Sequence, residues 1–150
     1  DACASYFGNV VVTDNTSRKI LKTFNIKENE YQVLIHVPKE KKYTANSDVK
    51  AMKAVAREVK AIHKEALSGN YWTAMTLNGL VYSAVLSYNP EIELEALKNG
   101  AVAAGLSGKG PAVAAVVPAA KVEDVLDAWQ RYEGDIIKTE INREKAHILR

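Results

Sequence analysis

The sequence predicts an α+β fold with an antiparallel sheet, and three features support this class. A Gly-rich stretch, Gly105-Leu106-Ser107-Gly108-Lys109-Gly110-Pro111, lies between the apolar runs 101–106 and 112–117, which is typical of a β-hairpin. Amphipathic helical patterns fill most of residues 49–99. Short β-branched runs precede those helices and follow the hairpin, so strands and helices are grouped rather than strictly alternating.

The composition indicates an ordinary globular chain without an obvious class of macromolecular partner. The chain has 150 residues, of which 47% are apolar and 25% charged, and its net charge is +2. Neither a nucleic acid nor a membrane partner is expected, since no strong charge bias and no apolar run of eighteen residues is present. The single cysteine, Cys3, excludes an intramolecular disulfide and favours a cytoplasmic location. The chain opens at Asp1 in a dense run of small residues, which favours a piece of a longer protein.

Residues 1–30 are predicted to be the end of a preceding domain. Residues 1–7 resemble the end of a helix that stops at Gly8. Residues 9–13 and 19–26 have strand patterns, and the residues between them, 14–17, are typical of a turn. The sequence around these two strands contains no further elements of a domain to which they could belong, so they are expected to be the edge of a preceding one.

Residues 31–150 are predicted to form the second domain. A strand over 32–37 is followed by an amphipathic helix that begins after Ser47 or Asp48 and ends near Leu67. The helix over 71–88 is apolar most of the way round, so it is expected to be buried on more than one side. A basic series lies off the apolar stripe of the first helix and is expected to be a solvated face: Lys50, Lys53, Arg57, Lys60 and Lys64.

The remaining elements complete a recognisable order. A helix begins at Pro90 and ends at Gly100, the Gly-rich hairpin follows, and the next helix ends near Gly134. A strand is expected over 135–141, and residues 142–150 fit either a short strand or a tail. From residue 32 onward this is the split βαβ, or ferredoxin-like, order with extra helices in the first crossover.

Residue chemistry alone does not identify a catalytic site. The three histidines lie far apart in different elements, so a zinc site is not expected. No nucleophile elbow is present, and Cys3 has no neighbouring histidine. The Gly-rich stretch has neither the P-loop spacing nor the Rossmann spacing, so on its own it is most simply a turn.

The Gly-rich stretch together with Ala112 resembles the third conserved motif of the GHMP kinase superfamily. Two further stretches resemble archaeal-type shikimate kinases: DACASYFG over 1–8, continuing into VVVTDN over 10–15, and GNYWTAMTLNGL over 69–80. The resemblance spans most of the chain. It implies that 31–150 is the ferredoxin-like C-terminal GHMP kinase domain, and that 1–30 ends an N-terminal domain of the ribosomal-protein-S5-like type.

The resemblance implies ATP-dependent phosphorylation of the 3-hydroxyl of shikimate, with Mg²⁺ as the metal, in aromatic amino acid biosynthesis. In the family, the main triphosphate loop lies earlier in the sequence than residue 1, and nothing in this chain matches it. The chain alone is therefore not expected to be a competent kinase.

The resemblance also implies two site elements in this chain. Asp1 has the placement of the residue that takes or orients the proton of the substrate hydroxyl, although the residue before it or a helix-capping role fits as well. The stretch with Gly105, Gly108 and Gly110 would support the phosphate loop and shape the substrate pocket. Ser107 would donate to substrate or to that loop, and Lys109 would either contact a phosphate or be a solvated lysine. Asn78 and Trp72 are expected to be packing residues.

Two alternatives remain at this point. One is another GHMP kinase, with homoserine as the substrate, and the other is a non-catalytic ferredoxin-like module that binds a small ligand. The apolar helix over 71–88 also predicts association, as a homo-dimer or with a missing N-terminal half.

Overall fold

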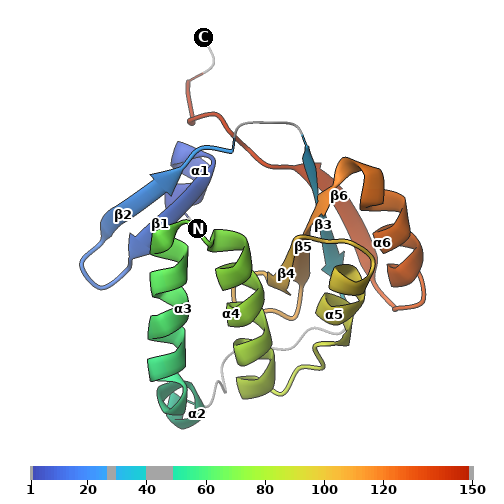
Figure 1. The fold of residues 1–150 in the computed structure, drawn as a ribbon, viewed down its shortest axis with the longest axis horizontal. Helices are drawn as coiled ribbons and strands as arrows, with labels where there is room; N and C mark the ends of the chain where they lie inside the picture. The colour runs from blue at the N-terminus through green and yellow to red at the C-terminus, as the bar shows by residue number, and fades with distance from the viewer. Residues whose placement is uncertain (1, 27–29, 40–48, 149–150) are drawn as a thin grey trace.

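The computed structural model describes residues 2–26, 30–39 and 49–148, which form two sheets and their covering helices (Figure 1). The N-terminal unit consists of α1 (Ala2–Phe7) and a two-stranded antiparallel sheet of β1 (Val10–Asp14) and β2 (Lys19–Phe24). As predicted, α1 ends at Gly8, whose φ is +66°. The turn between the strands is fixed by the Asp14 carboxylate, which accepts bonds from Thr16 N (2.9 Å) and Ser17 Oγ (2.7 Å).

The second sheet has four strands in the order β4-β5-β3-β6, and all neighbours are antiparallel. Its strands are β3 (Tyr31–Val37), β4 (Ala103–Leu106), β5 (Val113–Pro118) and β6 (Asp135–Glu140). Numbered along the chain from β3, these strands lie in the order 2-3-1-4. This is the split βαβ arrangement, so the predicted α+β, ferredoxin-like class is confirmed.

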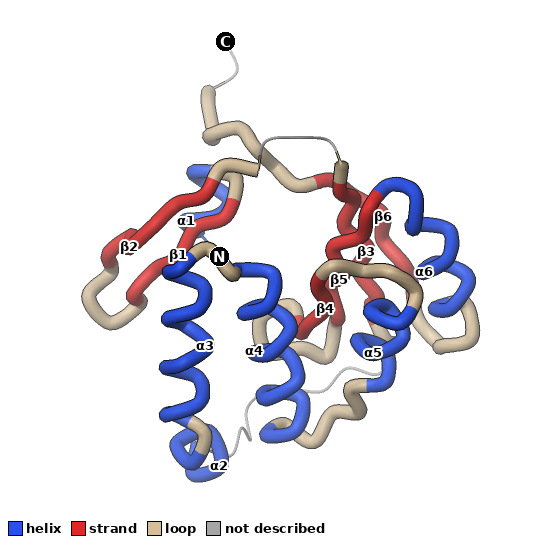
Figure 2. The backbone as a smooth tube through the Cα atoms, in the orientation of Figure 1, coloured by secondary structure: helices blue, strands red, loops and turns tan. Residues whose placement is uncertain are grey.

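In the described parts of the chain, six helical segments accompany the second sheet: α2 (Val49–Ala54), α3 (Ala56–Ser68), α4 (Tyr71–Val85), α5 (Glu91–Lys98), a short 3₁₀ turn η2 (Ala119–Lys121) and α6 (Val122–Trp129). Figure 2 shows α3 and α4 side by side, away from α6. Among the described residues, no helix is long and apolar enough to cross a membrane.

Three predicted helix bounds were wrong. The helix expected to end near Gly134 ends at Trp129, and turns and bends follow it over 130–134. The single helix expected up to Leu67 is interrupted at Val55 (φ −99°, ψ 10°), which separates α2 from α3. The apolar spacing continues across this break, because both helices have an apolar face, so periodicity could not reveal it. The residues expected to cap the start of this predicted helix, Ser47 and Asp48, lie outside the described residues. The helix expected to reach residue 88 ends at Val85, and Ser87 then adopts a φ of +56°.

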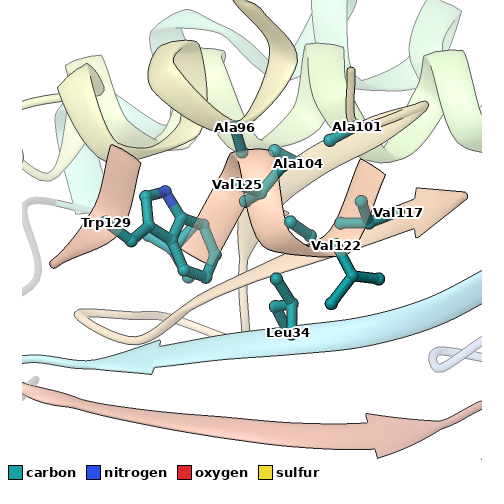
Figure 3. Packing of buried hydrophobic residues seen from close by; sticks show 10 residues of the cluster. Leu34, Ala96, Ala101, Ala104, Val117, Val122, Val125 and Trp129 are labelled. Carbon is teal, nitrogen blue, oxygen red and sulfur yellow. The ribbon is translucent and has the colours of Figure 1, made fainter. Parts of the chain in front are cut away.

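The main core lies between the four-stranded sheet and helices α5 and α6. Figure 3 shows Trp129 and Val125 of α6 facing Leu34 of β3 and Val117 of β5, and all four side chains are fully buried. The Trp129 indole N–H also donates to the carbonyl of Ile92 at 3.0 Å, which ties α6 to α5. Burial of such large apolar side chains is the main stabilising contribution to this half of the chain.

Helix α4 is packed on two sides, against β4 and against α3, as its apolar composition predicted. Its buried positions are Ala74, Gly79 and Ser83. Leu77 nevertheless remains 41% exposed, so α4 is not wholly enclosed by the described residues.

The segment 142–146, which follows β6, lies along the N-terminal unit without regular secondary structure (Figure 1). Asn9 N donates to the Asn142 carbonyl at 2.6 Å, and Ala146 N donates to the Tyr6 carbonyl at 2.9 Å. The Asn9 side chain both donates and accepts a hydrogen bond. Its Nδ2 donates to the Arg143 carbonyl (3.1 Å), and its Oδ1 accepts from Ile26 N (3.1 Å). Of the two predicted alternatives, a strand or a tail, the described part is an ordered tail.

Candidate functional site

The Gly-rich stretch is the tip of the β4–β5 hairpin, as its flanking apolar runs predicted. Ser107 N donates to the Ala112 carbonyl at 2.8 Å, and Gly110 N donates to the Ser107 carbonyl at 3.1 Å, which closes the turn. Ser107, Gly108 and Lys109 are exposed at the tip. The hairpin therefore presents a hydroxyl, a backbone turn and an amine to the surroundings.

The glycines of this stretch have different surroundings. Gly105 is buried in β4, and a Cβ there would lie 2.8 Å from the Met75 carbonyl of α4. A Cβ on Gly79 of α4 would lie 2.5 Å from Gly105 Cα, so these two glycines let the helix and strand backbones touch. By contrast, a Cβ on Gly108 would meet no described atom within 4 Å. Gly105 thus anchors the hairpin to α4, and Gly108 lies at its open end.

The exposed tip has groups that suit an anion. Gly108 and Gly110 both have positive φ values, +63° and +69°, so the backbone turns sharply around Lys109. Among the described residues, the N–H groups of Gly108 and Lys109 have no hydrogen-bond partner and the Lys109 amine has no ion pair. Free N–H groups in a turn, together with an amine and the Ser107 hydroxyl, can bind phosphate oxygens.

Asp1, the predicted proton acceptor, lies outside the described residues, so its role stays a prediction. The helix that follows it, α1, is held at its C-terminal end by the segment 142–146 described above. No group of three or more His, Cys, Asp or Glu that could hold a metal ion occurs in the described parts of the chain.

A cavity of about 320 Å³ lies between β1 and the helix pair α3–α4. Its wall is mainly apolar, and its polar side chains are Thr13, His63, Tyr71 and Asn78. Asn78, expected to be a packing residue, instead lines this cavity half-buried, and its amide has no partner among the described residues. Trp72 does pack as expected, with ring centroids 4.7 Å from Tyr71 and 6.2 Å from Tyr31.

Helical and strand periodicity did not reveal this cavity. Its apolar residues follow the same spacing that a closed helix-helix interface would have, and β1 comes from a distant part of the chain. A polar residue at position 78, within an otherwise apolar stretch of α4, was the one feature that could have marked it.

A second, smaller cavity of about 160 Å³ lies below the hairpin, between Tyr88, Leu106 and Pro111. Glu93 of α5 also lines it and is fully buried, with Oε1 accepting a bond from Ser83 Oγ at 2.9 Å. Burial raises the pKa of the Glu93 carboxyl above its usual value. The Ser83–Glu93 hydrogen bond joins α5 to α4. The place of Glu93 in the charged first turn of a helix did not suggest this structural role.

His36 of β3 is a second fully buried titratable group. Its ring lies 5.8 Å from the Trp129 ring and 6.4 Å from the Tyr132 ring. Burial lowers the pKa of His36, and the Tyr132 backbone offsets only part of that effect. Neutral His36 is therefore part of the core rather than a catalytic base.

A comparison of the sequence with known protein families identifies the region that contains the Gly-rich hairpin. The sequence model described as "GHMP kinases C terminal" matches residues 51–135, which include the helices from α3 to α6 and the Gly-rich hairpin. The chain belongs to the GHMP kinase C-terminal family. Within this GHMP kinase domain, the hairpin and α4 are joined by the Gly79–Gly105 contact.

The curated relatives include archaeal shikimate kinases. The chain is 43% identical over 149 residues to "Shikimate kinase" from Methanothermobacter thermautotrophicus, covering 99% of this chain and 51% of the relative. It is 42% identical over 139 residues to "Shikimate kinase" from Pyrococcus furiosus, covering 93% of this chain and 49% of the relative. The chain thus spans about half the length of the curated relatives it matches.

Solved structures of GHMP kinases share the fold. The homoserine kinase from Cytophaga hutchinsonii superimposes with a TM-score of 0.66 at 16% identity, over 96% of this chain and 52% of that one. The mevalonate kinase from Methanococcus jannaschii superimposes with a TM-score of 0.60 at 20% identity, over 80% of this chain and 44% of that one. At such identities the likeness concerns the fold alone.

Proposed function

We propose that this chain is the C-terminal part of an ATP-dependent kinase that phosphorylates the 3-hydroxyl of shikimate. The observation that carries the proposal is the 43% identity to a shikimate kinase over 99% of this chain. The homoserine alternative is supported by fold likeness alone, at 16% identity. A cytoplasmic location, the division at residue 30 and association through α4 stay predictions.

In the proposed reaction, the 3-hydroxyl oxygen attacks the γ-phosphorus of ATP, the bond to the ADP oxygen breaks, and the hydroxyl proton passes to a carboxylate. Asp1 is the proposed acceptor of that proton. The exposed hairpin tip supports the phosphates: the Gly108 and Lys109 N–H groups, the Ser107 hydroxyl and the Lys109 amine face no competing partner among the described residues. Gly105 and Gly110 shape the tip and hold it against its neighbours.

Mg²⁺ would neutralise charge on the transferring phosphoryl group. Because the described residues include no cluster of metal ligands, we assign no step of the reaction in this chain to the metal.

The first test is a coupled assay of ADP release by the protein from the complete reading frame that encodes this chain. Shikimate, homoserine and mevalonate are compared as substrates, and the product of the active one is identified by mass and phosphorus NMR. We expect release with shikimate and a 3-phosphate product. ADP release with homoserine and not with shikimate would contradict the proposal and indicate a homoserine kinase.

A second test concerns the hairpin tip. Lys109→Ala should raise KM for ATP several-fold, because it removes a charge-assisted contact to phosphate. The matched control is Lys138→Ala, an exposed lysine on β6 at the far edge of the sheet. If both variants keep the wild-type KM for ATP, Lys109 is a solvated lysine and the tip acts through Ser107 and the backbone alone.

A further inference from the structure

We propose that the 320 Å³ cavity between β1 and α3–α4 receives the hydroxyl-bearing ring of the acceptor substrate, and that His63 and Asn78 bind its hydroxyl groups. This inference rests on the proposed function and deepens it, because it assigns residues that select the acceptor.

The two polar residues come from neighbouring helices and reach the same cavity. Helices α3 and α4 are antiparallel neighbours joined by Gly69 and Asn70 (Figure 2). His63 is six residues before Gly69 and Asn78 eight residues after Asn70. At about 1.5 Å per residue, their levels along the helix pair therefore differ by only about 3 Å. Both side chains are half-buried, and neither has a partner among the described residues.

The remaining wall suits a compact, mostly carbon ring. Val12, Ile62, Ala66 and Met75 contribute apolar surface, which would exclude water from the faces of a ring. Pockets with a largely apolar wall and a few converging polar groups are typical of small-molecule sites, and this volume is at the lower end of their range.

The chemistry of the lining distinguishes which part of the acceptor enters. No Lys, Arg, Asp or Glu is among the residues that line the cavity in the described part of the chain. A carboxylate would have no cation to pair with, so it is expected to stay at the mouth. An amide and an imidazole both donate and accept, which matches hydroxyl groups.

The position of the cavity also fits the proposed reaction. Its β1 wall is separated from α1 only by Gly8 and Asn9, and Asp1 precedes α1 in the sequence. On its α4 wall, Met75 lines the cavity, while the Met75 carbonyl faces Gly105 of the hairpin. One turn of α4 thus connects the acceptor cavity with the proposed phosphate-supporting hairpin.

The kinetic test uses the protein from the complete reading frame. Asn78→Leu and His63→Leu remove the hydrogen-bonding groups while keeping side-chain bulk. Each should raise KM for shikimate by up to about tenfold, the effect of losing one or two hydrogen bonds, and leave KM for ATP unchanged. The controls are Thr73→Ala and Lys60→Ala, exposed residues of the same helices that do not line the cavity. Asn78→Gln and His63→Gln, which retain a donor and an acceptor, should recover part of the affinity.

A binding measurement on the wild-type protein tests the assignment even if the leucine variants fold poorly. Methionine methyl groups are labelled with ¹³C in the wild-type protein, and the Met75 signal is assigned by its loss in Met75→Leu. Adding shikimate should shift the Met75 methyl and leave that of Met52, which is not among the lining residues, in place. An unmoved Met75 signal overturns the assignment, as does a rise in KM for ATP alone, which would indicate that the cavity holds the nucleotide.

Failure of the inference and failure of the proposed function give different results. Wild-type protein that releases ADP with shikimate, but whose Asn78 and His63 variants keep the wild-type KM for shikimate, refutes only the cavity assignment. Wild-type protein that releases ADP with homoserine but not with shikimate refutes the proposed substrate.

Discussion

The four-stranded sheet and the β1–β2 hairpin bury their side chains to very different extents. Leu34, Val117 and Trp129 of the sheet unit are fully buried, whereas every residue of β2 except Phe24 is exposed. The hairpin unit is held instead by hydrogen bonds from remote segments, above all those of Asn9 to residues 142–143. Apolar burial therefore accounts for the stability of one unit, and directional polar contacts account for the position of the other.

The largest expected effect is in the sheet unit. Trp129→Ala should lower the free energy of unfolding by about 3–5 kcal/mol, because it empties a fully buried ring site. It also removes the bond to the Ile92 carbonyl. The measurement is urea unfolding followed by far-UV circular dichroism. Tyr6→Ala is the control in the hairpin unit, since Tyr6 is 57% exposed, and a loss as large as that of Trp129→Ala there would contradict the comparison.

A smaller effect is expected from pH, through His36. Because burial lowers its pKa in the folded state, the unfolded chain binds a proton more readily as the pH falls below the ordinary value of 6.5. The contribution of neutral His36 to the free energy of unfolding is therefore fully present above pH 6.5. It decreases below that pH, by at most about 1.4 kcal/mol per pH unit for one proton. Unfolding in urea at pH 7.5 and 5.5 measures this slope.

His36→Leu should make the slope shallower, because the buried imidazole is gone. The control is His147→Ala, which changes an exposed residue of the tail and should keep the wild-type slope. Equal slopes in wild type and His36→Leu would show that other groups control the acid sensitivity.

The most local effect is expected in the hairpin unit. Asn9→Ala removes two side-chain hydrogen bonds and should destabilise this unit by about 1–2 kcal/mol. Amide hydrogen exchange is the measurement: the Ile26 amide should exchange faster, and those of β3 should not change. Asn9→Gly suits the φ of +60° at this position, so it isolates the lost side-chain bonds from backbone strain. Faster exchange in β3 as well would mean that the two units unfold together.

Local chemistry allowed most of the fold to be predicted. Gly8 and Gly100 both have positive φ values and were correctly predicted to lie just after the ends of helices, whereas the helix expected to end near Gly134 ends at Trp129. Short-range periodicity placed the strands, and the order of elements then determined the split βαβ arrangement. These features depend on residues close together in the sequence, which is why a single sequence contains them.

The features that could not be predicted are contacts between distant residues. The break at Val55 interrupts a pattern that is apolar on both sides of it. The touching backbones at Gly79 and Gly105 need the hairpin to lie on α4, and the segment 142–146 binds through its backbone, which has no sequence pattern. Asn78 was expected to be a packing residue, because its surroundings depend on where β1 lies.

The bonds between Asn9 and the segment after β6 also determine an order of events in time. The Asn9–Arg143 bond joins residues 134 positions apart. During synthesis at about 5–20 residues per second, the later partner leaves the ribosome roughly 7 to 27 s after the earlier one. A β-hairpin forms in microseconds, so β1 and β2 can pair long before they are fixed in place. Throughout that interval the backbone N–H and the side-chain amide of Asn9 lack the carbonyls of residues 142 and 143 that accept from them in the folded protein.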